Sequence, residues 1–398
     1  MITGRPPLYD VVIVGGGPAG ATAATALATA GRTVLLLDKA GRIKPCGGAI
    51  PPRLIRDFDI PDTLIVGRAT SARMISPSAR HVEMPVGKGF VGMVNRDTYD
   101  EWLRVRAASA GAERRTGTFE TIERDDSGMA IVAYREDGRG GAINHIRART
   151  VIGADGARSA VARQAIPGAK RMPYVYAYHE MIKSPANGTD NFDQSRCDVF
   201  YQGKLSPDFY AWIFPHGDTA SIGVGSAKKG FALRDAVARL RHDAGLADCE
   251  TVRGEGAPIP LKPLKKWDNG RDVIVIGDAA GVVAPASGEG IYYAMASGRF
   301  AADAVETYLA TGQSKALSNA RRDFMKAHGR VFWILGIMQY FWYRSDKRRE
   351  RFVTICDDPD VQSLTWQAYM EKQLVHARPA AHARIFFKDL RHLLGSTA

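Results

Sequence analysis

The chain has 398 residues, of which 45% are hydrophobic and 24% are charged. This length and balance exclude a disordered or fibrous protein and favour a globular enzyme with two or three structural units. The net charge of +12 indicates attraction to polyanions, anionic lipid headgroups or acidic substrates, without choosing among them. Four scattered cysteines without a C-x-x-C pair argue against a disulfide framework, a dithiol redox centre or a metal site.

Residues 1–7 leave no room for the charged and apolar regions of a signal peptide before the first apolar run. We therefore expect a cytoplasmic protein that is not secreted, since the unpaired cysteines also fit a reducing compartment. Aromatic and basic residues are not interleaved as in a nucleic-acid module, so no nucleic-acid partner is expected.

Residues 8–38 predict a strand at 11–14, a helix at 19–30 and a strand at 33–37 that ends at Asp38. In the turn Gly15-x-Gly17-x-x-Gly20, the first glycine permits tight turning and the second lets backbone amides approach a pyrophosphate. The third allows the helix to pack closely on the strand, and Asp38 is placed to accept hydrogen bonds from a ribose. This motif predicts a dinucleotide site and fits NAD and FAD equally well.

The rest of the chain changes pattern twice. Two apolar stretches between 119 and 149 flank a turn-rich segment at 137–141 and predict a hairpin, followed by a buried strand at 151–154. Alternating patterns then predict strands of an antiparallel sheet at 196–201, 209–214 and 220–224. A helix is expected at 232–244, and a buried strand at 272–277 follows it. From about residue 290 to the end the pattern is mainly helical.

Two further segments resemble the second and third fingerprints of the flavoprotein hydroxylase superfamily: 153–159 (GADGARS) and 277–290, with its Gly-Asp and Gly-Glu-Gly elements. The resemblance implies that Asp278 binds the flavin ribityl chain and that the turn with Gly288 and Gly290 approaches the pyrophosphate and the flat ring. Arg96 matches an arginine that contacts the cofactor in that superfamily, although a surface arginine at a helix start remains an alternative. Together the motifs favour FAD as the bound cofactor, with a nicotinamide donor visiting transiently.

Two more motifs narrow the family. Pro207-x-x-Tyr210-x-Trp212-x-Phe214-Pro215 and Lys44-Pro45-Cys46-Gly47-Gly48 resemble segments of the geranylgeranyl reductases, and the run as a whole is most similar to the branch acting on chlorophyll and bacteriochlorophyll esters. The resemblance implies an FAD-dependent reductase, with NADPH as donor. Such an enzyme saturates three of the four double bonds of the geranylgeranyl tail of a pigment, or of geranylgeranyl diphosphate, to give a phytyl tail.

These patterns predict an α/β fold: a discontinuous Rossmann-like FAD-binding domain with an inserted antiparallel-sheet substrate domain and a helical C-terminus. The FAD-binding domain is expected at 1–172 and 266–325. The substrate domain is expected between these parts, at 173–265, and the helical region at 326–398.

An isolated alkene cannot accept a hydride first, so protonation must lead or be concerted. In a strand, Tyr210, Trp212 and Phe214 share one face, and we expect them to bind the substrate as an aromatic wall, although a core-facing strand is the alternative. Tyr210 and Trp212 are expected to stabilise the developing cation by roughly 0.5–2 kcal/mol.

Cys46 is a candidate proton donor, but a thiol is a weak acid for an alkene, and closure of the flavin-proximal loop is the other interpretation. Asp155 lies in a glycine-flanked turn that favours a structural or cofactor-binding role over catalysis. His179 and His216 show no metal-ligand spacing and are interpreted as ordinary polar residues.

Residues 331–343 form an apolar run that is too short to span a bilayer. One interpretation is a buried helix or part of the wall of an isoprenoid tunnel. The other is a helix in the membrane interface, supported by a basic cluster of Arg344, Lys347, Arg348, Arg349 and Arg351. The second predicts peripheral contact with the photosynthetic membrane.

Two rival functions remain. An FAD-dependent monooxygenase acting on a hydrophobic substrate would share the cofactor motifs. A membrane-docked or nucleic-acid-binding flavoprotein without catalysis is prompted only by the charge. The aromatic pattern and the Cys46 segment discriminate against the monooxygenase, and the absence of interleaved aromatic and basic residues argues against the second interpretation.

Overall fold

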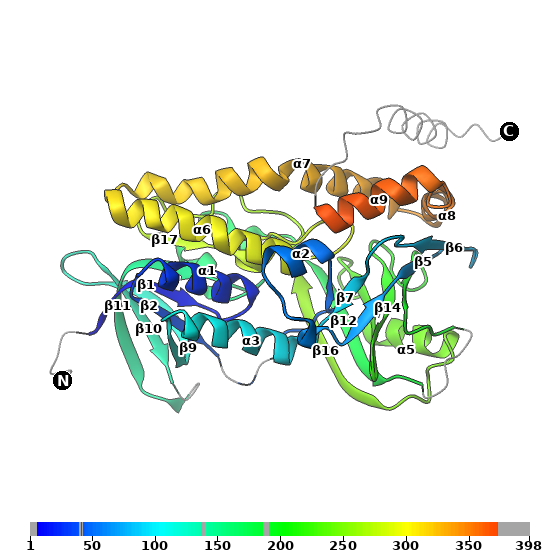
Figure 1. Ribbon diagram of the computed structural model, residues 1–398, viewed down its shortest axis with the longest axis horizontal. Coiled ribbons are helices and arrows are strands. Elements are labelled where there is room, and N and C mark those ends of the chain that lie inside the picture. Colours follow the sequence, from blue (N-terminus) through cyan, green and yellow to red (C-terminus); the bar gives the residue numbers. More distant parts are fainter. Residues whose placement is uncertain (1–5, 40, 42, 137–139, 186–190, 373–398) are drawn as a thin grey trace. The chain divides into compact units, whose positions relative to one another are not determined.

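The computed structural model describes residues 6–39, 41, 43–136, 140–185 and 191–372 (Figure 1). The chain divides into two compact units, each assembled from three stretches of sequence. The dinucleotide unit comprises 1–44, 96–174 and 258–329, and the sheet unit comprises 45–95, 175–257 and 330–398.

The dinucleotide unit is built on a parallel sheet. Its parallel strands are, in spatial order, β8 (Glu113–Thr116), β2 (Val34–Asp38), β1 (Leu8–Val14), β11 (Ile143–Gly153) and β17 (Val273–Val275). Two antiparallel strands, β10 (Ala130–Arg135) and β9 (Thr118–Arg124), extend the sheet beyond β11. Because parallel strands end at one edge, the turns after β1, β11 and β17 meet there, and the expected Rossmann-like fold is confirmed.

Three helices of this unit, α1 (Pro18–Thr29), α3 (Arg96–Ser109) and α6 (Ile291–Thr311), lie side by side, with α1 between the other two (Figure 1). Small residues make the close approach of α1 and α6 possible. A Cβ added at Gly298 of α6 would lie only 2.5 Å from the Ala19 carbonyl oxygen of α1. A short helix, α4 (Ala160–Ala165), follows β11.

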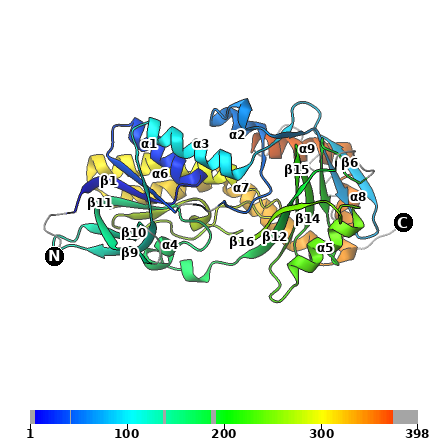
Figure 2. The same ribbon diagram turned by 90° about the horizontal axis from the view of Figure 1, so that it is seen from below.

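The sheet unit contains a seven-stranded sheet. Its spatial order is β16 (Thr251–Ile259), β12 (Val175–Lys183), β15 (Thr219–Ser226), β14 (Ala211–His216), β13 (Arg196–Phe200), β5 (Ser71–Ile75) and β6 (His81–Pro85). Helix α5 (Leu233–Asp243) covers one face of β12 and β15 (Figure 2). Alternate apolar residues of the strands, among them Ile213 and Ile222, pack in one core cluster with Leu240 of α5. The opposite face of β14 is therefore not covered by α5.

Smaller elements complete the sheet unit. Strands β3 (Ala49–Ile50), β7 (Val91–Met93) and β4 (Gly67–Ala69) form a three-stranded sheet, and α2 (Pro52–Asp57) precedes β4. Helix α7 (Ser318–Trp342) begins in the dinucleotide unit and ends in the sheet unit, where α8 (Asp346–Ile355) and α9 (Pro359–Glu371) follow.

The segment boundaries differ from those expected. Residues 45–95 group with the sheet unit because β5 pairs in parallel with β13, a long-range pairing that no local pattern predicts. The helical tail, expected as a separate region from 326, groups with the sheet unit from 330, and the second dinucleotide segment begins at 258 rather than 266.

Strand detail differs too. The expected strand at 151–154 is the end of the longer β11, whose first half pairs with β10. The turn expected at 137–141 lies partly outside the described residues, which omit 137–139.

Candidate flavin and substrate sites

The turn between β1 and α1 has the geometry of a phosphate cradle. Gly15 has a φ of +107°, and a Cβ added at Gly20 would lie 1.9 Å from the Gly15 carbonyl oxygen, so neither position accepts a side chain. Gly17 begins α1 without a side-chain cap, and no atom lies within 4 Å of the place its Cβ would occupy. The helix N-terminus thus faces open space, as an incoming pyrophosphate requires.

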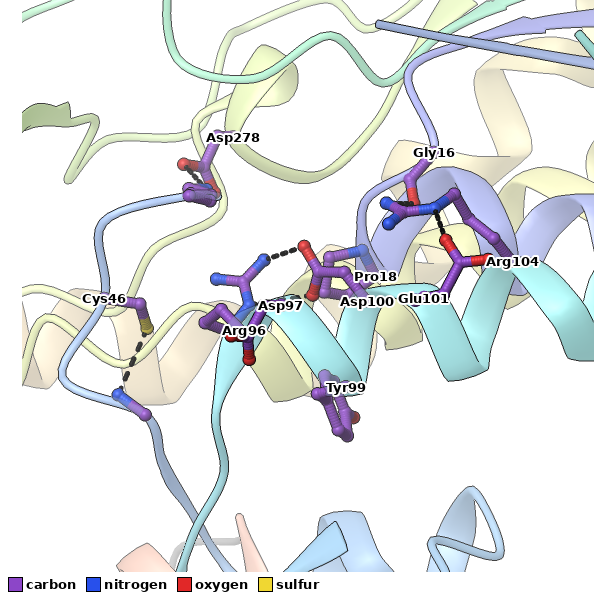
Figure 3. A network of polar contacts seen from close by, with 12 residues as sticks. Gly16, Pro18, Cys46, Arg96, Asp97, Tyr99, Asp100, Glu101, Arg104 and Asp278 are labelled. Atoms are coloured by element: carbon purple, nitrogen blue, oxygen red, sulfur yellow. Dashed lines mark hydrogen bonds and ion pairs between the residues drawn. The ribbon is translucent and has the colours of Figure 1, made fainter. Parts of the chain in front are cut away.

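Asp38 ends β2 beside this turn. One carboxylate oxygen accepts the Gly16 N–H at 3.0 Å, and the other lies 3.2 Å from Nη1 of Arg104. The same Arg104 nitrogen donates to the Gly16 carbonyl at 3.4 Å, so Arg104 is directed toward the turn (Figure 3). Sequence analysis missed Arg104, although its position two helical turns after Arg96 on α3 was the available signal.

Arg96, expected to contact the cofactor, is only 4% exposed. Its guanidinium forms a two-pronged ion pair with Asp100, one turn further along α3, with distances of 2.8 and 2.7 Å (Figure 3). The pair neutralises a charge that would be costly to bury alone. Its contact with the cofactor stays a prediction.

Asp278 follows β17 and forms an ion pair with Lys44. The turn that leads into α6 passes beside it: Gly288 has a φ of +65°, and a Cβ added at Gly290 would lie 3.8 Å from Oδ1 of Asp278. The structure therefore brings three of the predicted cofactor residues together, and Lys44 joins them from the segment before Cys46.

Asp155 has a local structural task. Its carboxylate accepts the hydroxyl of Ser159 and the backbone N–H groups of Ala160 and Val161, the latter two at 2.6 and 3.2 Å. These bonds cap the start of α4. Burial outweighs them and raises the pKa of Asp155 above its usual range. The geometry agrees with the structural interpretation.

These groups fit a flavin dinucleotide. Open backbone amides at Gly17 suit the pyrophosphate, Asp38 suits the ribose, and the Asp278 carboxylate suits the hydroxyl groups of a ribityl chain. In the described part of the chain, no three His, Cys, Asp or Glu side chains gather in a way that could hold a metal ion.

In the sheet unit, the expected aromatic face is present on β14. The ring centroids of Tyr210 and Trp212 lie 5.9 Å apart, and those of Trp212 and Phe214 lie 6.2 Å apart. Burial, with smaller contributions from Tyr343 and Cys46, raises the pKa of Tyr210, so its hydroxyl stays protonated. Trp212 and Phe214 lie on the face of β14 opposite α5, and Tyr210 directly precedes the strand.

The Cys46 segment packs against this face. A Cβ added at Gly47 would lie 3.2 Å from the Phe214 ring and 3.7 Å from Nε1 of Trp212. His216 donates from Nε2 to the Gly47 carbonyl at 2.9 Å. The Cys46 sulfur accepts the Gly48 N–H at 3.4 Å, the dashed line that leaves Cys46 in Figure 3. The two motifs that carried the family resemblance are therefore in contact.

The C-terminal region supports the same aromatic group. Tyr343 packs on Tyr201 and Phe209, with centroid distances of 5.4 and 6.3 Å. Arg349, 2% exposed, donates to the carbonyls of Pro207 and Tyr343. One charge of the predicted basic cluster is thus buried and structural, which sequence alone could not distinguish.

The end of α7 has two different faces. Phe332, Trp342 and Tyr343 are buried, whereas one stripe of the helix is exposed: Trp333, Ile337, Tyr340 and Phe341, at 68%, 40%, 57% and 37%. Arg344 stacks 3.8 Å from the centroid of the Tyr340 ring. Within the described ranges, none of the helices combines the length and apolar character needed to cross a bilayer.

Comparison with known proteins agrees with these features. A family model described as pyridine nucleotide-disulphide oxidoreductase matches residues 9–186, and one described as lycopene cyclase protein matches residues 230–387. Geranylgeranyl diphosphate reductase of Rhodobacter capsulatus is 57% identical over 387 residues, which cover 97% of this chain and 98% of that protein.

Two solved structures share the fold. A geranylgeranyl bacteriochlorophyll reductase-like protein of Thermoplasma acidophilum has a TM-score of 0.81 at 22% identity, covering 96% of this chain and 100% of its own. The flavin-dependent brominase Bmp2 has a TM-score of 0.73 at 19% identity, covering 98% and 100%.

The parallel sheet with its glycine turn, the match to the pyridine nucleotide-disulphide oxidoreductase model and the reductase relative identify a flavin-dependent oxidoreductase. The relatives show which family of oxidoreductases this is. The chain belongs to the geranylgeranyl reductase family, as the aromatic motif at 207–215 and the cysteine motif at 44–48 predicted.

Proposed function

We propose that the protein saturates three double bonds of a geranylgeranyl tail, carried by a bacteriochlorophyll-type pigment or by diphosphate, to give a phytyl tail. FAD is the proposed bound cofactor and NADPH the proposed donor. The observation that carries the proposal is the contact between the Cys46-Gly47-Gly48 segment and the aromatic face of β14, in a chain 57% identical to a relative named for this reaction.

The chemistry requires a hydride and a proton at an alkene without an activating carbonyl. Reduced flavin, when bound, supplies the hydride. Trp212 and Tyr210 face the positive charge that develops on a tertiary carbon and stabilise it through their ring faces by roughly 0.5–2 kcal/mol. Phe214 extends the apolar contact and helps to exclude water from the cation, which would otherwise trap it as an alcohol.

The proton donor is assigned to the same face. Cys46 is partly exposed and lies close enough to Tyr210 to influence its pKa. Tyr210 remains protonated because burial raises its pKa. Cys46 is our first candidate for proton transfer, with closure of the loop before Gly47 as its other role.

The decisive experiment is mass analysis of products. Reduced protein is incubated under nitrogen with the geranylgeranyl pigment and, separately, with geranylgeranyl diphosphate. Stepwise gains of two mass units, ending at three steps, are expected for at least one substrate. A gain of one oxygen in air, coupled to NADPH oxidation, would instead establish the monooxygenase alternative. Comparing the two substrates also decides which carrier is used.

We further propose that the protein contacts an anionic membrane surface, the environment of a C20 tail, through the exposed stripe of α7. Four apolar side chains at helical spacing, followed by Arg344, Lys347 and Arg348, form the amphipathic pattern of an interfacial helix.

Co-sedimentation with phosphatidylglycerol vesicles is expected at low salt and is expected to weaken as salt rises. Replacing Arg344, Lys347 and Arg348 by Gln should abolish binding. The matched control removes three charges from exposed positions elsewhere, Lys228, Lys229 and Arg239. Equal loss of binding in both triple variants would assign the effect to net charge and refute the stripe.

A further inference from the structure

A row of polar side chains extends from Trp212 across the neighbouring strands of the sheet unit. The Trp212 indole N–H donates to the Ser221 hydroxyl at 3.1 Å, and that hydroxyl lies 3.1 Å from Nδ1 of His179. Nε2 of His179 lies 3.5 Å from a carboxylate oxygen of Glu255. Trp212, Ser221 and His179 are all at least nine-tenths buried.

Strand register explains how these residues meet. His179 on β12, Gly223 on β15 and Trp212 on β14 are paired across three neighbouring strands, so they lie in one row on one sheet face. Gly223 has no side chain, and a Cβ there would lie 2.1 Å from the Trp212 ring. The indole therefore lies flat across β15, with its N–H directed at Ser221, two residues before Gly223.

The direction of the Trp212 bond follows from the donor inventory. An indole nitrogen only donates, so the Ser221 oxygen accepts from it, and the same hydroxyl shares a hydrogen bond with Nδ1 of His179. Nε2 of His179 faces the Glu255 carboxylate at 3.5 Å, as a charge contact rather than a hydrogen bond. The row therefore leads from the indole N–H to a carboxylate.

Glu255 is held in its ionised form. Partial burial opposes ionisation, but His179 and Arg253 outweigh it and lower the pKa of Glu255 below its ordinary value. Nε of Arg253 donates to the same carboxylate at 3.0 Å. The row of polar side chains therefore has the Glu255 carboxylate at one end and the Trp212 ring of the candidate site at the other.

We propose that Ser221, His179 and Glu255 are positioning residues for Trp212: Ser221, held by His179, fixes the indole over Gly223 by accepting its N–H, and the negative charge of Glu255 at the end of the row increases the electron density of the ring face. A ring richer in electrons attracts a cation more strongly. The inference rests on the proposed function, because a developing carbocation is the charge that this ring would stabilise.

The kinetic test separates positioning from folding. His179→Asn keeps a polar group beside the Ser221 hydroxyl but loses the ring nitrogen that faces Glu255. It should lower kcat by roughly twofold to tenfold while KM stays nearly constant, because the cation exists only in the transition state. In a Trp212→Phe background, the same change should have no further effect on kcat. An equal effect in both backgrounds would overturn the proposal.

The second test does not depend on turnover. In protein labelled with ¹⁵N-indole tryptophan, the Trp212 signal is the one that Trp212→Phe removes. Its N–H resonance should move in Ser221→Ala, and also in Glu255→Gln, which acts only through His179. If Glu255→Gln leaves the Trp212 resonance of the folded protein unmoved, the proposed link from Glu255 to Trp212 is refuted. A moved resonance with no reduction of any geranylgeranyl substrate would instead reject the proposed function alone.

Discussion

Acid should destabilise this protein through one buried histidine. His216 is 4% exposed, and burial lowers its pKa from 6.5 to about 4, even though its bond to the Gly47 carbonyl favours the charged form. The folded state therefore keeps His216 neutral at a pH where the unfolded chain binds a proton. Stability contributed by neutral His216 is present above pH 6.5 and is lost as pH falls from 6.5 toward 4.

The size of the effect follows from the shift. A pKa difference of this size corresponds to about 3 kcal/mol when fully developed, and roughly 2 kcal/mol of it should appear between pH 7 and pH 5. His216→Gln keeps an N–H donor for Gly47 but cannot titrate. Urea unfolding of both proteins at pH 7 and pH 5 gives the double difference, in which the linkage of all other groups cancels.

The wild type should lose about 2 kcal/mol more than His216→Gln over this range. Equal losses in the two proteins would refute the reasoning, because they would show that His216 titrates alike in the folded and unfolded chains. An independent check is the His216 ring resonance, which should stay that of neutral imidazole at pH 5 in the folded protein.

Gly20→Ala should prevent flavin retention, because its Cβ would lie 1.9 Å from the Gly15 carbonyl; the flavin absorbance of purified protein checks this, with Gly336→Ala, where nothing lies within 4 Å, as the control. Full flavin content in Gly20→Ala would contradict the cradle. Cys46→Ala should retain flavin and lose most turnover with the pigment substrate, measured as product mass per flavin. Wild-type turnover in that variant would remove Cys46 from the site.

Local patterns predicted the dinucleotide unit better than the sheet unit. The turn from Gly15 to Gly20 is continuous in sequence, so its strand and helix could be recognised from periodicity and glycine spacing alone. The joining of residues 45–95 to the sheet unit could not, because β5 and β13 are separated by more than 100 residues and pair in parallel.

The candidate site shows the same division. Tyr210, Trp212 and Phe214 follow from strand periodicity, which places alternate residues on one face. The roles of His179 and Ser221 could not be predicted in this way, because a lone buried histidine has no sequence signature. Their signal was the run Ser221-Ile222-Gly223-Val224-Gly225, whose small residues alternate on one face.

That alternation has a physical purpose. Gly223 accommodates the ring of Trp212, and Gly225 accommodates that of Phe209, since a Cβ at either glycine would lie within 2.6 Å of the ring. An aromatic pattern on one strand therefore required a complementary small-residue pattern on its neighbour.

The two units carry different kinds of information about the reaction. The glycine turn, Asp38 and the Asp278 loop suit any flavin dinucleotide, and a brominase shares the overall fold at 19% identity, so these features alone do not select reduction over oxygen chemistry. In the proposed function, the features that select reduction are in the sheet unit: the aromatic face, the Cys46 segment packed on it, and the row of polar side chains behind Trp212. If this division holds, variants of Gly223 should retain flavin yet lose alkene reduction, because the side chain displaces the Trp212 ring without touching the dinucleotide unit's turn. Loss of flavin from such variants would show that the assignment of tasks to the two units is wrong.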